Sequence, residues 1–158
     1  MGRILCLLLL TAAWLGADEK YDGPVPPKPD LPYLLHAKSL TETEAAQARE
    51  ENRKNETAYV VAGTSSPART PLAEPIFIVN AVKLAPEKLE LYQLDVRNGN
   101  REVSVSTKGR KGSSKVFHLR VTRLAEHIFR VEAAESLENG EYVLTPSGEN
   151  QVFCFEVY

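Results

Sequence analysis

The most concentrated chemistry in the sequence is a run of basic residues interrupted by two glycines. Its cationic side chains are those of Lys108, Arg110, Lys111 and Lys115. Residues 97–123 hold eight basic side chains and one acidic, whereas residues 126–156 hold seven acidic and one basic. This asymmetry predicts a binding loop for an anionic glycan, a lipopolysaccharide phosphate or an acidic protein patch. The alternative is a solvated hairpin tip whose charges pair across strands with the acidic half.

Residues of the types that enzymes use are scattered and match no catalytic motif. The histidines His36, His118 and His127 lack the i, i+4 spacing of a helical zinc site. His118 and His127 belong to successive predicted strands, so antiparallel pairing would bring them together, but zinc sites normally have three or four protein ligands. No G-x-S-x-G elbow is present. We therefore expect no cofactor, no metal and no enzymatic activity, with a small hydrolase or metal-dependent enzyme as the alternative.

The N-terminus predicts export. Residues 1–17 have the pattern of a secretory signal peptide: Arg3, the apolar run Ile4–Leu15, and a small-residue cleavage site at Leu15-Gly16-Ala17. A helix needs about 20 apolar residues to span a membrane, and this run is shorter. We therefore expect no transmembrane segment after cleavage. A periplasmic or extracellular location follows, and it argues against a nucleic-acid partner.

Charge and cysteine content restrict the remaining possibilities. Loss of Arg3 with the signal peptide changes the formal net charge from −2 to −3. That total is too small to predict a polyionic partner. Only Cys154 remains, so no internal disulfide is available and the fold must depend on its core. Cys154 lies in an apolar strand, where we expect a small buried hydrophobe.

The region before the sheet divides into two segments. Residues 18–32 carry five prolines and predict an extended spacer, or alternatively a proline-rich ligand for a partner groove. Residues 33–75 predict a mixed segment with a loop at its end. Thr41 and Glu44 have the spacing of a capping box ahead of a helix over Ala45–Lys54, and Thr57–Ala62 has the composition of a strand.

Residues 76–158 predict an antiparallel β-sandwich. Their apolar residues recur with a period of two in seven short runs, a spacing typical of sandwiches. The runs are Ile76–Val82, Leu89–Arg97, Arg101–Thr107, Val116–Thr122, His127–Ala133, Glu141–Leu144 and Val152–Tyr158. Asn98-Gly99 predicts a tight hairpin, because both positions favour positive φ. In the last run Phe153 and Phe155 alternate with Val152 and Cys154, which predicts cover on both faces.

The spacing Leu137-x-x-Gly140-x-Tyr142 resembles the tyrosine corner of immunoglobulin-like and fibronectin-like β-sandwiches. The resemblance implies a Greek-key sandwich in which the Tyr142 hydroxyl bonds backbone a few residues upstream. It also implies that Glu141–Leu144 is the sixth strand and Val152–Tyr158 the seventh. The layout further resembles small exported bacterial proteins, which implies no activity.

Together these features predict a mainly β protein with a short N-terminal helix–strand segment. We expect an exported, non-enzymatic interaction or accessory protein of the cell envelope. Its partner is an envelope protein or, through residues 108–115, an anionic glycan. The sequence leaves open the oligomeric state and whether residues 33–75 pack on the sandwich.

Overall fold

The structure, a computed structural model, describes residues 21–106 and 114–158. The predicted signal peptide therefore lies outside the described residues. The described chain is mainly β, and its helical content is a single 3-10 turn, η1 (Pro86–Lys88). Within these residues no helix is long and apolar enough to cross a membrane.

The first sheet has five antiparallel strands. In spatial order they are β11 (Leu119–Arg123), β12 (Ile128–Ala133), β7 (Ile76–Asn80), β1 (Pro32–His36) and β2 (Ser39–Glu42). β7 lies in the middle and pairs with β12 on one side and β1 on the other. The sheet therefore joins residues 32–42 to residues 76–80 and 119–133.

The second sheet has nine strands. Its path runs β3 (Glu44–Gln47), β14 (Gln151–Val157), β13 (Gly140–Pro146), β8 (Leu89–Arg97), β9 (Asn100–Ser106), β5 (Glu56–Ala62) and β4 (Arg49–Arg53). Off this path, β10 (Val116–Phe117) pairs with β8, and the short β6 (Arg69–Thr70) pairs in parallel with β14. The path pairs are all antiparallel.

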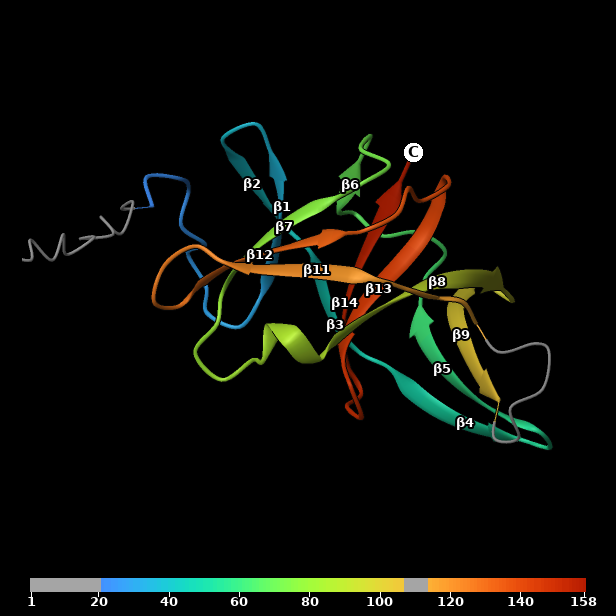
Figure 1. Cartoon of the computed structure of the whole chain (residues 1–158). Coiled ribbons are helices and arrows are strands. Elements are labelled where there is room, and N and C mark those ends of the chain that lie inside the picture. The colour runs from blue at the N-terminus through green and yellow to red at the C-terminus, as the bar shows by residue number, and fades with distance from the viewer. Residues whose placement is uncertain (1–20, 107–113) are drawn as a thin grey trace, which may run out of the picture.

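The second sheet closes on itself. Its two terminal strands, β3 and β4, are consecutive in the chain and are separated only by Ala48. The Ala48 N–H donates to the Asn150 carbonyl at 2.8 Å, at the end of β14. The seven path strands therefore form a ring, which we call the strand ring. Figure 1 shows β4, β5, β9 and β8 on one side of the molecule, the five-stranded sheet on the other, and β13 and β14 between them.

The structure has two apolar cores, and the strands β8, β13 and β14 contribute residues to both of them. The larger core lies between the five-stranded sheet and the outer face of β8, β13 and β14, and includes Phe77, Tyr142 and Phe155. The smaller core lies inside the strand ring and includes Val103, Val143 and Cys154. The prediction that the last strand is covered on both faces is confirmed, because Phe153 and Phe155 belong to the first core and Val152 and Cys154 to the second.

The mainly β, sandwich-like prediction is confirmed, and each expected strand of residues 76–158 is present. The run at 116–122 is divided at His118 into β10 and β11, which pair with different sheets. The hairpin at Asn98-Gly99 is also confirmed. Both residues have positive φ, +50° and +77°, and Arg97 pairs with Asn100 across the turn. The further strands come from residues 32–75.

The predicted helix over Ala45–Lys54 is wrong, since the segment forms β3 and β4. The residues are good helix formers, but a helix would bury only a thin stripe of alanines. As strands, their backbone groups instead pair with β14 and β5. The capping box is absent as well, because Glu44 binds Arg101. Tertiary pairing has overridden local propensity.

Residues 33–75 are integral to both sheets, which answers the question that the sequence left open. β1 and β2 complete the first sheet, while β3, β4, β5 and β6 belong to the second. The end of the proline-rich segment is also attached. Pro26 is buried, Lys28 Nζ lies 2.8 Å from a Glu42 oxygen, and the Asp30 N–H donates to Asn80.

Candidate functional site

A pocket opens at one end of the strand ring. Its cavity volume is about 200 Å³. The walls come from five strands and one turn: Tyr59, Glu90, Tyr92, Val103, Val105, Val143, Thr145, Pro146, Gly148, Glu149 and Val152. We call it the ring pocket. It is the best candidate for a functional site in the described chain, because ligand sites are concave and mostly apolar with a few polar groups.

The pocket exists because β8 and β9 separate. They pair only from Asp95 to Arg97 with Asn100 to Glu102, next to their hairpin. Further along, β10 takes over the edge of β8 at Leu91 and Tyr92, while β9 stays with β5. The ring therefore widens toward this end, and the side chains of Tyr92 and Val105 line the resulting space.

The interior of the ring is layered along its axis. Alternate residues of β9 point inward, so Arg101, Val103 and Val105 lie at successive depths. Val103 and Val143 are buried in the middle layer. On neighbouring strands Glu90 and Thr145 are register partners at the open end. The pocket thus has an apolar floor and a polar rim.

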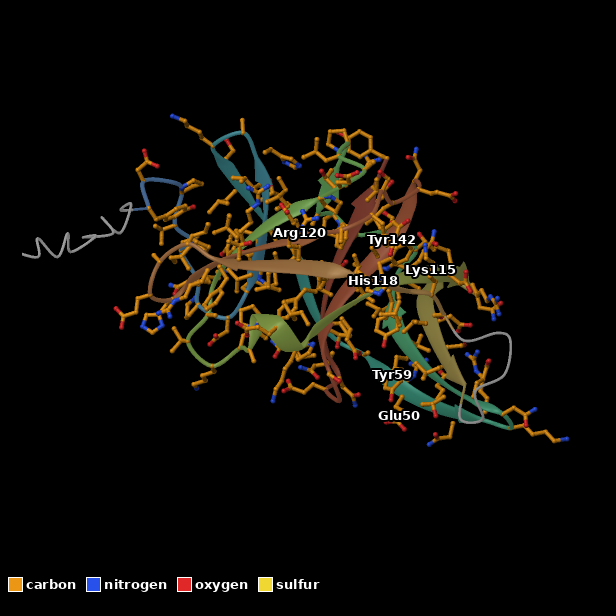
Figure 2. All side chains as sticks on the ribbon, viewed as in Figure 1. Glu50, Tyr59, Lys115, His118, Arg120 and Tyr142 are labelled. Atoms are coloured by element: carbon orange, nitrogen blue, oxygen red, sulfur yellow. The ribbon has the colours of Figure 1, made fainter. Side chains whose placement is uncertain are left out.

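The rim carries a tyrosine–carboxylate pair. The Tyr92 hydroxyl donates to Glu90 Oε2 at 2.8 Å. Burial, reinforced by this hydrogen bond, raises the pKa of Tyr92 to about 12. At neutral pH the phenol therefore stays protonated, and it serves as a donor rather than a nucleophile. Tyr59 contributes a second ring, and it faces the same side of the sheet as its register partner Glu50 (Figure 2).

The opposite end of the ring is closed by an ion cluster that the sequence did not predict. Arg101 is 1% exposed and binds Glu44 with both carboxylate oxygens, at 2.6 and 2.9 Å. Its remaining N–H groups reach the Gly63 and Ala62 carbonyls, and Glu141 Oε2 lies 3.5 Å from Nη1. We call these three charged residues, Arg101, Glu44 and Glu141, the arginine cluster.

The two carboxylates of the arginine cluster differ in their environment. Burial opposes ionisation of Glu44, but the bidentate Arg101 contact outweighs it and lowers the pKa of Glu44. For Glu141, burial dominates and raises the pKa, although the Ser66 N–H donates to it at 3.0 Å. Arg101 is therefore neutralised chiefly by Glu44. The arginine cluster closes this end of the strand ring, and none of its three residues lines the ring pocket.

Three residues of the predicted basic loop, Lys108, Arg110 and Lys111, lie outside the described residues. Lys115 is described. Its Nζ lies 3.0 Å from Glu135 and 4.2 Å from the centre of the Phe117 ring. Lys115 is thus paired with an acidic residue of the C-terminal half. Both ends of the loop meet at the ring, since the Ser114 N–H donates to the Ser104 carbonyl of β9.

The histidines are not brought together. β11 and β12 pair antiparallel, so His118 lies beside Ala134 at one end of the hairpin while His127 lies at the other end. The expected approach of these histidines is therefore wrong, since residues that begin successive antiparallel strands are at opposite ends. The side chain of His118, labelled in Figure 2, is 89% exposed, and its Nδ1 lies 3.4 Å from a Glu135 oxygen. In the part of the chain that is described, no three His, Cys, Asp or Glu residues are placed to hold a metal.

Of the residues Leu137, Gly140 and Tyr142, the first and the last are buried in the larger core, and Gly140 is partly buried between them. Tyr142 is fully buried, and its hydroxyl donates to the Glu138 carbonyl at 2.7 Å. Leu137 is 4% exposed and its N–H donates to Ala73. At Gly140 a Cβ would lie only 3.0 Å from Gln93 Nε2. A larger residue at this position would therefore require the Gln93 side chain to move slightly.

Sequence reasoning did not find the pocket, because its lining residues are spread from Tyr59 to Val152 and meet only through ring closure. The sequence did contain one signal of the pocket. Val103 and Val105 form an apolar row on the inward face of their strand, and Tyr92 lies on the strand opposite.

Compared with known protein families, curated proteins and solved structures, the chain showed no significant match.

Proposed function

We propose that the protein is an exported, non-enzymatic binding protein of the cell envelope that holds a small ligand in the ring pocket. The observation that carries the proposal is the separation of β8 from β9, which leaves a lined cavity inside an otherwise closed ring. The secretory pattern of residues 1–17 supports export. A role in binding a ligand without transforming it is also consistent with an accessory protein.

The size of the cavity supports a small ligand. An apolar protein cavity of about 150 Å³ is sufficient to bind benzene. The ring pocket, at about 200 Å³, holds one ring with a short substituent. Its walls are fixed by hydrogen-bonded strands, so little ordering is needed on binding, which favours affinity.

We propose that Leu137-x-x-Gly140-x-Tyr142 is a tyrosine corner of the immunoglobulin-like or fibronectin-like kind. The hydrogen bond from Tyr142 to the Glu138 carbonyl, four residues upstream, supports it.

Binding can be tested with 2-phenylethanol and NMR of ¹³C-labelled valine methyl groups. We expect saturable shifts of Val103, Val143 and Val152. Val105, which is 37% exposed at the mouth, offers a blocking site, and Val105→Trp should abolish the shifts. Val96→Trp is the matched control, because Val96 is an exposed ring valine that does not line the pocket. Shifts that do not saturate, or that persist in Val105→Trp, would contradict the proposal.

A further inference from the structure

We infer that the ligand of the ring pocket is a small organic cation, an amine carried on a single apolar ring. The inference rests on the proposed function and adds the chemical class of the ligand. It is drawn from the charge of the rim, the aromatic walls and the depth at which each is placed.

The charged residues that line the pocket are both acidic, Glu90 and Glu149. Among the described residues neither pairs with a lysine or arginine, and the one hydrogen bond to the Glu90 carboxylate comes from Tyr92. Elsewhere glutamates are commonly paired, as Glu44 is with Arg101 and Glu132 with Arg120. Lys88 lies nearby, because it lines adjoining hollows together with Glu90 and with Glu149, but it lines no part of the ring pocket. The rim of the ring pocket therefore presents two carboxylates that form no ion pair with any described residue.

The aromatic walls favour the same charge. Tyr59 and Tyr92 both line the cavity, and the faces of tyrosine rings attract cations. The phenol of Tyr92 remains neutral at physiological pH, because its pKa is about 12. Its hydroxyl also orients the Glu90 carboxylate, leaving the other oxygen of Glu90 for a ligand. A carboxylate beside aromatic faces is a combination suited to an ammonium group.

The order of the layers determines how such a ligand lies. Glu90 and Thr145 are at the rim, and Val103 and Val143 are one layer deeper. Beyond the valines the arginine cluster closes the ring, with Arg101 already bound to Glu44. A ligand therefore enters with its apolar ring first and leaves its cationic group at the rim. A long chain has no room, because the far end is sealed.

The test uses three compounds of one shape, 2-phenylethylamine, 2-phenylethanol and 3-phenylpropanoate, titrated into the full chain by NMR and calorimetry. We expect the amine to bind about tenfold or more tightly than the alcohol, as one charge-assisted hydrogen bond provides. The carboxylate should bind more weakly than the alcohol because it meets Glu90 and Glu149. Added salt should weaken amine binding and leave alcohol binding unchanged.

Variants separate charge from shape. Glu90→Gln should weaken amine binding about tenfold and leave alcohol binding unchanged, since the amide keeps the size and still accepts from Tyr92. Glu74→Gln, an exposed glutamate outside the pocket, is the control and should change neither. Val105→Trp should abolish binding of both compounds.

The outcomes distinguish the inference from the proposed function. If the alcohol or the carboxylate binds as tightly as the amine and Val105→Trp still blocks it, the cation inference is overturned and the binding function stands. If none of the three compounds binds, both are overturned. Unchanged amine affinity in Glu90→Gln would also overturn the inference.

Discussion

At the scale of single residues, Arg101 has the most demanding position in the protein. Among the described residues it is the largest fully buried side chain, and its guanidinium is surrounded by two carboxylates and two carbonyls. A charge removed from water is tolerated only when its hydrogen bonds are satisfied. The arginine cluster satisfies them by joining β9 to β3 and β13 across the ring.

We expect Arg101→Met to lower the free energy of unfolding by about 3–5 kcal/mol, because it leaves the buried Glu141 and the partly buried Glu44 without a counter-charge. Urea denaturation measures this. Arg97→Met is the control; Arg97 is exposed and its loss should cost less than about 0.5 kcal/mol. A triple change, Arg101→Met with Glu44→Gln and Glu141→Gln, should recover part of the stability. Equal stability of Arg101→Met and the wild-type chain would show that the cluster contributes nothing.

At the scale of elements, the start of the first sheet is attached through Asp30. Its Oδ1 accepts the N–H groups of Val82, Lys83 and Leu84 at 2.7–2.9 Å, in the segment between β7 and η1. Asp30 has φ +58°, a conformation that Asp and Asn tolerate better than most residues. The Asp30 carboxylate thus joins the proline-rich segment to the residues that follow β7.

This attachment predicts a pH dependence. Partial burial of Asp30 opposes ionisation, but the three N–H donors outweigh it and lower its pKa. A carboxylate with a lowered pKa stabilises the fold above the ordinary Asp value of about 4, and the stabilisation is lost as the pH falls through the lowered pKa. We therefore expect Asp30→Asn to cost roughly 2 kcal/mol at pH 7 and progressively less as the pH falls below the ordinary Asp value toward the lowered pKa.

The measurement is urea denaturation of both chains across this pH range. Asparagine accepts the same conformation, so backbone strain does not confuse the comparison. A difference between Asp30→Asn and the wild-type chain that is constant with pH would contradict the assigned role of the charge.

At the scale of the whole molecule, β13 and β14 belong to both cores. Phe155 stacks on Tyr142 at 5.6 Å and meets Phe77 edge-on at 5.0 Å in the larger core. Its neighbour Cys154 is buried in the ring, where burial raises the pKa of the thiol to about 12. One strand therefore cannot lose its outer cover without disturbing the ring. We infer that the two cores unfold together.

We expect Phe155→Ala to lower the free energy of unfolding by about 3–5 kcal/mol, with a single transition. Tyrosine fluorescence and thiol labelling of Cys154 in a chain that begins at Asp18 should give the same midpoint. Val82→Ala, at an exposed valine, is the control and should change little. Labelling of Cys154 that lags behind the fluorescence change would show that the ring unfolds separately.

Several elements were predictable because their signals are local. Val103 and Val105 alternate with polar residues, and Asn98-Gly99 favours the positive φ of its turn. The helix prediction over Ala45–Lys54 also used only local signals, and for that reason it failed. Local composition was its whole basis, and it contained no information on the strands β14 and β5 that pair with this segment.

The amino-acid sequence is sufficient to predict that the protein is mainly β and that its last strand is covered on both faces, because period and apolarity are properties of neighbouring residues. Three further features depend on contacts between distant segments: β3 and β4 close a ring, Arg101 meets Glu44 inside it, and a pocket opens where β8 leaves β9. These features depend on the register between strands far apart in the chain. Register is set by the sum of many weak contacts, which no single stretch of sequence contains.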